Sequence, residues 1–471
     1  MMNRTGLPQG GNLYDVVRSW TDALPICKDS GIGLSMNSVY REDGNFEQEH
    51  EYEDQSFHFK CDDKISIYGV FDGHDGVQLA KQALDTITAE VLFGQLEGKT
   101  SDEDVKYILK QAFSAVEQNY EQVIGDKLAE KASLQMEIPD NINMYEAYQK
   151  YPNVVNKLNA INTELSCGTT VVLALIYLNR LFVANVGDSR ALLCKTDEDG
   201  VLRVLQLSQD HVLSNEDEIL RLIMLGISKE QILKGFRIGN HEHTRCLGHY
   251  LVKGGYKEFE ELACASTEPV IAEPEIAGGI SLDGSYKFLI LMSSGLYRSL
   301  EEATGTQCVN KEIIQLVAEQ FKYQSTLTGV AQAVVDKVVR IHHDFYMSRS
   351  GSDKLSINKR EDITLLIRNF NFPMPNAISP TRSPNITFSS ITRMNDLNEK
   401  YALGVSVNKM NDTKKESTFG TSDGSTRDST QTDSISISRS PEKVKPYVNF
   451  NEYYILVEKA KRERILPDIE F

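Results

Sequence analysis

The stretch that most constrains the fold is SIYGVFDGHDG, residues Ser66–Gly76. The apolar residues of Ile65–Phe71 predict a buried strand, and this strand runs directly into the turn DGHDG, Asp72–Gly76. A carboxylate at a strand end beside a glycine can offer its side chain and the next backbone carbonyl to a hard cation. A bare Asp-Gly pair is also typical of an ordinary turn. On these residues alone, both interpretations stay open.

Composition narrows the class of protein. The chain of 471 residues carries a formal net charge of −17, and 41% of its residues are hydrophobic. Nucleic acids and anionic membranes both favour basic surfaces, so the acidic balance disfavours them as partners. The seven cysteines form no CxxC pair, which is typical of reduced intracellular thiols. No apolar run approaches the ~18 residues of a membrane span. We therefore expect a cytoplasmic protein with no nucleic-acid or membrane partner.

Strand-like and helix-like segments alternate along the chain. Val105, Ile108, Leu109, Ala112 and Val116 share one face of a predicted helix. Two apolar runs, 171–177 and 181–186, predict a hairpin that turns at Asn179-Arg180. Residues 125–165 are polar and helix-prone, and we interpret them as an insertion rather than core. The pattern favours an α+β fold in which two antiparallel sheets pack face to face with helices outside, an α-β-β-α sandwich.

Several motifs, in the same order, resemble those of the metal-dependent PPM (type 2C) serine/threonine phosphatases. VFDGHDG is similar to the family's VFDGHGG, with Asp75 where the family usually has glycine. CGTT, VANVGDSR, LSQDH, TRCLGH, SSGLYR and EDIT follow along the chain. In TRCLGH this chain has His249 where the family has an aspartate after the glycine. The resemblance covers residues 20–372 and implies a PPM-phosphatase-like α-β-β-α sandwich.

The resemblance also implies a degenerate two-metal site. In the family, two divalent cations share carboxylate ligands and a bridging water attacks phosphorus. Asp72 and the carbonyl of Gly73 keep the first ligand position, and Glu361 stands at the last, one methylene longer than the family's aspartate. Ser294 replaces an aspartate that binds metal directly, and Arg298 puts a positive charge where a further ligand would lie.

A further position of the resemblance is degenerate. Ser38 stands where the family has an arginine that holds the substrate phosphate. We therefore expect a pseudophosphatase with no catalytic residue and no required cofactor. Asp72, His74, Asp188 and Glu361 could still hold one weak cation, Mg²⁺ or Mn²⁺. The alternative is an active Mg/Mn-dependent protein serine/threonine phosphatase with an atypical metal site.

Shorter matches, from SWTDALP near the start to PYVNFNEYY near the end, resemble one branch of the family. Its members are pseudophosphatase adaptors that bind and activate the TGF-β-activated MAP kinase kinase kinase. The resemblance implies a non-catalytic adaptor in TGF-β, NF-κB and innate immune signalling, with the kinase catalytic domain as partner. It also implies an inhibitor-of-apoptosis protein and a stress-activated MAP kinase as partners, although no motif localises either contact.

Composition and resemblance together predict four segments. These are a flexible N-terminus (1–19), the phosphatase-like domain (20–372), a disordered Ser/Thr-rich linker (373–445) and a C-terminal kinase-binding helix (446–471). The linker has too few apolar residues to offset its ordering entropy. The predicted kinase-binding residues follow helical spacing: Tyr447, Val448, Phe450, Tyr453, Tyr454 and Val457. A plain scaffold whose terminal helix joins its own core is a third interpretation, which the long spacer disfavours.

Overall fold

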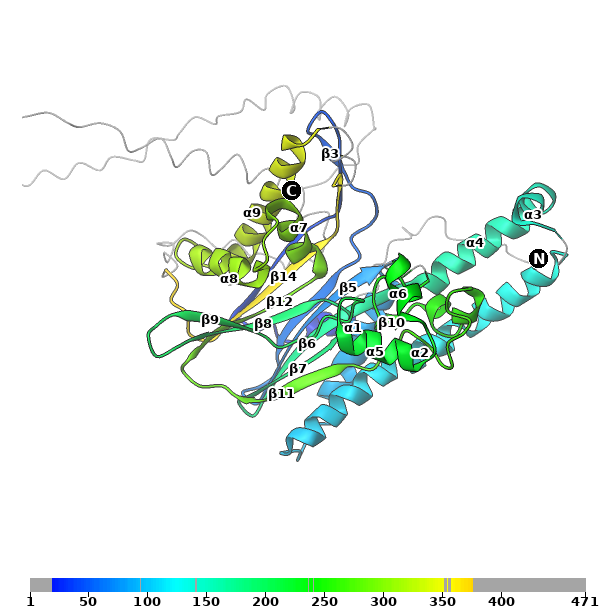
Figure 1. Ribbon diagram of the computed structural model, residues 1–471. Helices are drawn as coiled ribbons and strands as arrows, with labels where there is room; N and C mark the ends of the chain where they lie inside the picture. The colour runs from blue at the N-terminus through cyan, green and yellow to red at the C-terminus, as the bar shows by residue number, and fades with distance from the viewer. Residues whose placement is uncertain are drawn as a thin grey trace, which may run out of the picture. The chain divides into compact units, whose positions relative to one another are not determined.

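The computed structural model describes residues 19–375, apart from 94, 140–141, 236, 240, 351–353 and 355–356. The predicted C-terminal helix and its kinase-binding residues lie outside the described residues, as do 1–18 and 376–445. Figure 1 shows the described chain as two stacked sheets with helices on their outer faces. Among the described residues, no helix combines the length and apolarity needed to cross a membrane.

The first sheet carries the strand that ends in the DGHDG turn. Its order is β11-β7-β6-β5-β4, and β10 pairs with β6. All these neighbours are antiparallel. The strands are β4 (Gln55–Lys60), β5 (Ile65–His74), β6 (Gly168–Tyr177), β7 (Arg180–Val186), β10 (Leu247–Gly248) and β11 (Glu275–Ser281). The predicted hairpin is β6–β7, but it turns at Leu178 and Asn179, whose φ angles are 49° and 61°, one residue earlier than predicted.

The second sheet has the order β1-β14-β12-β8-β9, and a small third sheet has the order β13-β2-β3. The second sheet consists of β1 (Ser30–Ser35), β8 (Arg190–Thr196), β9 (Leu202–Gln206), β12 (Tyr286–Met292) and β14 (Ile363–Asn369). The third consists of β2 (Ser38–Tyr40), β3 (Phe46–Glu47) and β13 (Lys359–Arg360). The ladders of both sheets are antiparallel.

Strand β12 shows why the two sheets must be covered on both faces. Successive side chains of a strand point to opposite faces. Leu289 and Leu291 are buried between the sheets, against Tyr68 and Val172 of the first sheet and other residues of that layer. Phe288, Ile290 and Met292 are buried in the layer shared with the helices on the outer face. A continuous apolar run is therefore expected for this strand, because both of its faces are buried.

Helices form the two outer layers, which confirms the predicted α-β-β-α sandwich. The first sheet is covered by α1 (Gln78–Leu92), α2 (Asp102–Met136) and α4 (Pro152–Ser166), with α3 (Met144–Lys150) beside α4. The second sheet is covered by α7 (Ser294–Thr304), α8 (Val309–Gln320) and α9 (Leu327–Ser348). A separate apolar cluster contains α5 (Glu216–Met224), α6 (Lys229–Gly235) and the 3₁₀ turns Tyr250–Val252 and Tyr256–Glu258; a further 3₁₀ turn is Trp20–Ala23.

The interpretation of residues 125–165 as an insertion outside the core is wrong in part. Helix α2 continues to Met136, and α4 buries Ile161 and Leu165 in the core layer of the first sheet. The end of α2 and helix α4 therefore add to that layer instead of extending away from it. The five residues predicted on the apolar face of α2 are all buried: Val105, Ile108, Leu109, Ala112 and Val116.

Candidate functional site

Asp72 lies near the end of β5 and contacts the first turn of α7 in the opposite layer. The backbone N–H of Ser294 donates to Asp72 Oδ2 at 2.9 Å, and the Ser294 hydroxyl donates to the same oxygen at 2.8 Å. The carboxylate thus satisfies one backbone N–H at a helix start, where a negative charge is favourable. Burial raises the pKa of Asp72 to about 7, and the charges of Asp188 and Glu361 add to the shift.

Asp188 lies in the connection between β7 and β8 and is almost completely buried. Its Oδ2 accepts from Tyr297 at 2.8 Å and from the Arg298 guanidinium at 2.6 Å, while His243 Nε2 lies 3.0 Å from its Oδ1. Burial alone would raise the pKa of Asp188, but the charges of His243 and Arg298 outweigh it and hold the pKa below its usual range. Asp188 is therefore ionised at neutral pH.

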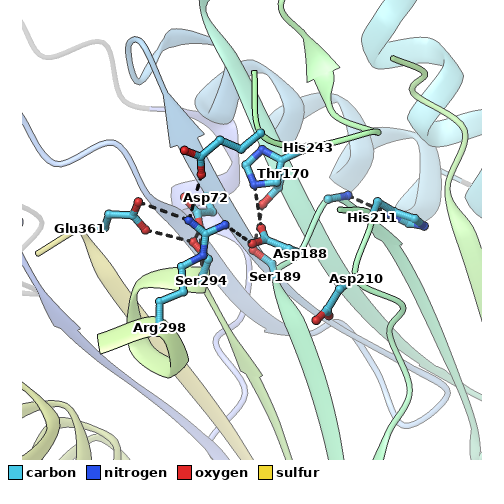
Figure 2. A network of polar contacts seen from close by, with 12 residues as sticks. Asp72, Thr170, Asp188, Ser189, Asp210, His211, His243, Ser294, Arg298 and Glu361 are labelled. Carbon is cyan, nitrogen blue, oxygen red and sulfur yellow. Dashed lines mark hydrogen bonds and ion pairs between the residues drawn. The ribbon is translucent and has the colours of Figure 1, made fainter. Parts of the chain in front are cut away.

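Arg298 on α7 is the central cation of the site, as Figure 2 shows. Besides Asp188, its guanidinium contacts Glu242 at 3.3 Å and Glu361 at 3.5 Å. Burial alone would lower the pKa of Arg298, but the negative charges of Asp188 and Glu361 outweigh burial and raise the pKa above its usual value. The guanidinium is thus permanently charged and joins carboxylates from three separate segments of the chain.

Glu361 is positioned by the turn that leads into β14. The neighbouring carboxylate of Asp362 accepts from the backbone N–H groups of Asn37 at 2.6 Å and Glu53 at 2.9 Å, which fixes this turn. The Ser294 hydroxyl lies 3.4 Å from Glu361 Oε2.

Ser38 on β2 lies beside a guanidinium that comes from another strand. Arg360, on β13, donates to the Ser38 hydroxyl and to the Ser35 hydroxyl, each at 3.0 Å, and also to the carbonyl of Met36. Arg360 is only 5% exposed, so these protein groups use donors that a substrate phosphate would need. An arginine is therefore close to Ser38, but its guanidinium already donates hydrogen bonds to other groups of the protein.

The residues present do not fit a two-metal centre. Mg²⁺ needs near-ideal oxygen geometry and dehydrates reluctantly. One oxygen of Asp72 accepts two hydrogen bonds from Ser294, and one oxygen of Asp188 accepts from Tyr297 and Arg298. The guanidinium, moreover, lies among the carboxylates that two cations would have to share. Like charges at such distances repel strongly away from bulk water.

The structure brings four predicted residues into one contact network: Asp72, Ser294, Arg298 and Glu361. Gly73 follows Asp72 in β5, and Ser38 contacts the network's neighbour Arg360. Sequence reasoning missed Tyr297, Glu242 and His243. Tyr297 had a signal, because it precedes Arg298 in the motif SSGLYR. Glu242 and His243 directly precede the matched motif TRCLGH, but nothing in their own sequence pattern marks them as site residues.

Comparison of the sequence with known proteins shows which family the chain resembles. The profile described as Protein phosphatase 2C matches residues 81–342, more than half of the chain. The chain is 26% identical over 348 residues to "TGF-beta-activated kinase 1 and MAP3K7-binding protein 1" of Caenorhabditis elegans, covering 73% of this chain and 82% of that protein. It is 24% identical over 332 residues to "Probable protein phosphatase 2C 42" of Arabidopsis thaliana, covering 64% and 77%.

These matches confirm the predicted resemblance to a kinase-binding adaptor within the phosphatase-like family. The profile falls within the region 20–372 that carries the quoted motifs. The chain therefore belongs to the protein phosphatase 2C family.

Proposed function

We propose that this chain is a non-catalytic signalling adaptor that binds and activates a MAP kinase kinase kinase, with a pseudophosphatase domain as its interaction scaffold. The observation that carries the non-catalytic part is the position of Arg298. Its guanidinium pairs with Asp188 at 2.6 Å and contacts Glu361 at 3.5 Å, so a protein cation neutralises the carboxylates that a metal would need.

The magnitude of the reaction's barrier supports this proposal. Hydrolysis of a phosphate monoester needs up to ~10²¹-fold acceleration, which in this family depends on two correctly placed cations. Ser294 offers a neutral hydroxyl in place of a carboxylate and already donates it to Asp72. The domain accordingly requires no cofactor and holds at most one weak Mg²⁺ or Mn²⁺, at Asp72, Gly73 and Glu361.

The alternative function is an active Mg/Mn-dependent serine/threonine phosphatase with an atypical metal site. Asp72, Asp188 and Glu361 still converge on one site, and the relatives include proteins named as phosphatases. The two functions make opposite predictions for the isolated protein. The full chain in excess Mn²⁺ should hydrolyse a phosphothreonine peptide no faster than its Asp72→Ala variant. Turnover that Asp72→Ala abolishes would establish the alternative instead.

A gain-of-ligand variant tests the same site from the opposite direction. Replacing Ser294→Asp together with Arg298→Asp removes the guanidinium and restores two carboxylates. Mn²⁺ should then bind more tightly than to the wild type, as measured by isothermal titration calorimetry. Unchanged affinity would show that Arg298 is not what keeps metal out.

The kinase contact is proposed from the relative's name and from the aromatic spacing of residues 446–471. A short isolated helix is marginal in water, so an apolar stripe on it favours docking into a partner's groove. An inhibitor-of-apoptosis protein, a stress-activated MAP kinase and a cytoplasmic location belong to the same proposal. The partner would engage Tyr447, Val448, Phe450, Tyr453, Tyr454 and Val457.

Phe450 provides the sharpest test of this contact. Truncating a buried aromatic anchor typically costs ~2–4 kcal/mol, or roughly 30- to 1000-fold in affinity. Phe450→Ala should therefore abolish capture and activation of the kinase domain while leaving the melting temperature of the folded domain unchanged. Phe46→Ala is the matched control, because Phe46 is 66% exposed on the domain. Normal kinase binding by Phe450→Ala, or a lowered melting temperature, would contradict the proposal.

A further inference from the structure

We call the acidic side chains around Ser294 and Arg298 the carboxylate network: Asp72, Asp188, Glu242 and Glu361. A group of histidines lies beside this network but belongs to none of its contacts. We call His74, His241 and His249 the histidine cluster. His74 ends β5, His241 lies in the loop after α6, and His249 directly follows β10. The ring centroids of His241 lie 4.9 Å from those of His74 and 4.6 Å from those of His249. One ring nitrogen from each residue lies within 4.8 Å of the other two.

The nitrogens of the cluster are buried without partners. His74 Nε2, His241 Nε2 and His249 Nδ1 have no hydrogen-bond partner among the described residues. The exposed fractions of His241 and His249 are 5% and 1%. A buried polar atom left unpaired costs its full desolvation penalty, and most such atoms in folded proteins are satisfied. Three unpaired nitrogens in one group of adjacent rings indicate a ligand that satisfies them together.

The backbone around the cluster is arranged to hold these rings together. His249 has φ 57°, a left-handed conformation that is strained for a residue other than glycine. Its N–H donates to the carbonyl of Cys167 at 2.9 Å, which keeps it in place. At Gly168, a Cβ would lie 2.3 Å from His74 Nε2. Only glycine at that position leaves room for the imidazole.

We infer that the histidine cluster is a binding site for Zn²⁺. Three neutral imidazoles are a ligand set that borderline divalent metals prefer, and three protein ligands leave a fourth tetrahedral position for water. Zn–N bonds of about 2.0–2.1 Å require nitrogens about 3.3 Å apart. One nitrogen from each ring already lies within 4.8 Å of the other two, so a modest rotation of the rings would bring the three to this spacing.

Neighbouring charges are compatible with a cation at this place. Lys253 is the nearby ammonium group, and it is paired with Glu117 Oε1 at 2.9 Å and donates to the carbonyl of Cys246 at 2.8 Å. Glu117 also accepts from the N–H of Gly248 at 2.6 Å, directly before His249. The carboxylate therefore neutralises the lysine and fixes the backbone that carries one ligand.

The inferred site differs in chemistry from the carboxylate network next to it. Oxygen ligands suit Mg²⁺ and Mn²⁺, whereas imidazole nitrogens suit zinc. His243 separates the two, because its Nε2 lies 3.0 Å from Asp188 while its ring centroid lies 5.0 Å from that of His241. Zinc in the cluster would tie the end of β5 to the loop after α6 and to the residue that follows β10.

Co²⁺ is a spectroscopic probe for such a site, because tetrahedral Co²⁺ absorbs visible light much more strongly than octahedral Co²⁺. The full metal-free chain should bind one equivalent of Co²⁺ with a tetrahedral spectrum, and Zn²⁺ should displace it. X-ray absorption of the zinc-loaded wild type should show nitrogen donors at about 2.0–2.1 Å. Absence of binding, or a shell of oxygen donors only, would overturn the inference without any variant.

Variants assign the ligands. His241→Gln and His249→Asn should each weaken zinc binding by more than about 100-fold, beyond the effect of changing a supporting residue. Asparagine is chosen for His249 because it tolerates the left-handed conformation. His343→Gln, on α9, is the matched control and should bind zinc normally. Asp72→Asn should also bind zinc normally, and loss of binding there would assign the metal to the carboxylate network instead.

Discussion

The guanidinium of Arg298 balances the negative charge of the carboxylate network. Asp188, Glu242 and Glu361 all lie within 3.5 Å of its guanidinium, and without it three negative groups would face one another. Removing one partner of a buried ion pair is strongly destabilising, because it leaves uncompensated charge. The same removal also frees oxygen ligands for a hard cation.

Arg298→Ala should therefore destabilise the metal-free domain by about 3 kcal/mol, and Mn²⁺ should restore part of this loss by binding only to the folded state. Urea unfolding with and without Mn²⁺ measures both effects. Arg203→Ala is the control, because Arg203 forms an exposed pair with Asp197 and should cost less than ~1 kcal/mol. Equal responses of the two variants to Mn²⁺ would contradict this account.

Some site residues could be predicted from the sequence and others could not, for a physical reason. The apolar run before Asp72 predicts a strand whose end carries the carboxylate, and the structure has β5 ending at His74. Ser294 and Arg298 lie one turn apart on one helix, so one motif contains both. Glu242 reaches Arg298 across 56 residues, and only tertiary packing decides such a contact.

At the scale of elements, the edge of the second sheet is closed by a helix instead of another strand. The side-chain amide of Gln332 on α9 accepts from the N–H of Leu34 and donates to its carbonyl, both at 3.0 Å. An exposed strand edge is a template for unwanted pairing. The close approach of α9 depends on Gly33, where a Cβ would lie 2.5 Å from backbone atoms of Ala331 and Gln332.

Gly33→Ala should therefore destabilise the domain by about 1–3 kcal/mol, since the clash is with backbone that cannot rotate away. Gly125→Ala is the matched control, because Gly125 lies in α2 with nothing within 4 Å of an added Cβ. That substitution should stabilise by up to about 1 kcal/mol. Thermal melting separates the two, and equal shifts would rule out close packing as the cause.

Helix α5 is tied to the segment before β10 through Glu218. Its carboxylate accepts from Arg221 at 2.9 Å and from Arg245 at 2.6 Å. Burial alone would raise the pKa of Glu218, but Arg245 and Arg221 outweigh burial and lower the pKa to about 2, from 4.5. Because the folded state lowers this pKa, its stabilisation is present above pH ~4.5 and is lost as the pH falls towards 2.

The stability difference between the wild type and Glu218→Gln should therefore be constant above pH ~5. It should shrink by about 3 kcal/mol as the pH falls to 2, at ~1.4 kcal/mol for each unit of pKa shift. Chemical unfolding at a series of pH values measures the difference. A difference that grows on acidification would have the wrong sign for a lowered carboxyl pKa.

Over the whole molecule, the alternation of apolar runs predicted the sandwich but not the contribution of every helix. Leu289 and Leu291 illustrate the success, since a run buried on both faces predicts a central strand. Helix α4 illustrates the failure: only Val155, Ile161, Leu165 and Ser166 of its 15 residues are buried. Because most residues of α4 are polar, the sequence pattern did not reveal the narrow apolar face that packs in the core.

Composition makes a separate prediction for the chain beyond the domain. Residues 373–445 are rich in serine, threonine and asparagine, and a segment of this kind is a preferred site of proteolysis. Brief trypsin treatment of the full chain should first cut there and leave a fragment that melts like the intact domain. Mass spectrometry identifies the ends. A protected fragment that spans 373–445 would instead indicate a second folded unit.

The ion pairs of Arg298 have a consequence for how this chain can evolve. Arg298→Asp alone would place a fourth carboxylate beside Asp188, Glu242 and Glu361 with no cation among them. Ser294→Asp alone would supply a ligand whose charge the guanidinium cancels. Each single step towards a two-metal centre therefore passes through a form that is less stable or in which the guanidinium still opposes a second cation. Selection that acts on one substitution at a time would therefore not restore a two-metal centre. Under the proposed function, the domain surface can then change in response to binding partners instead.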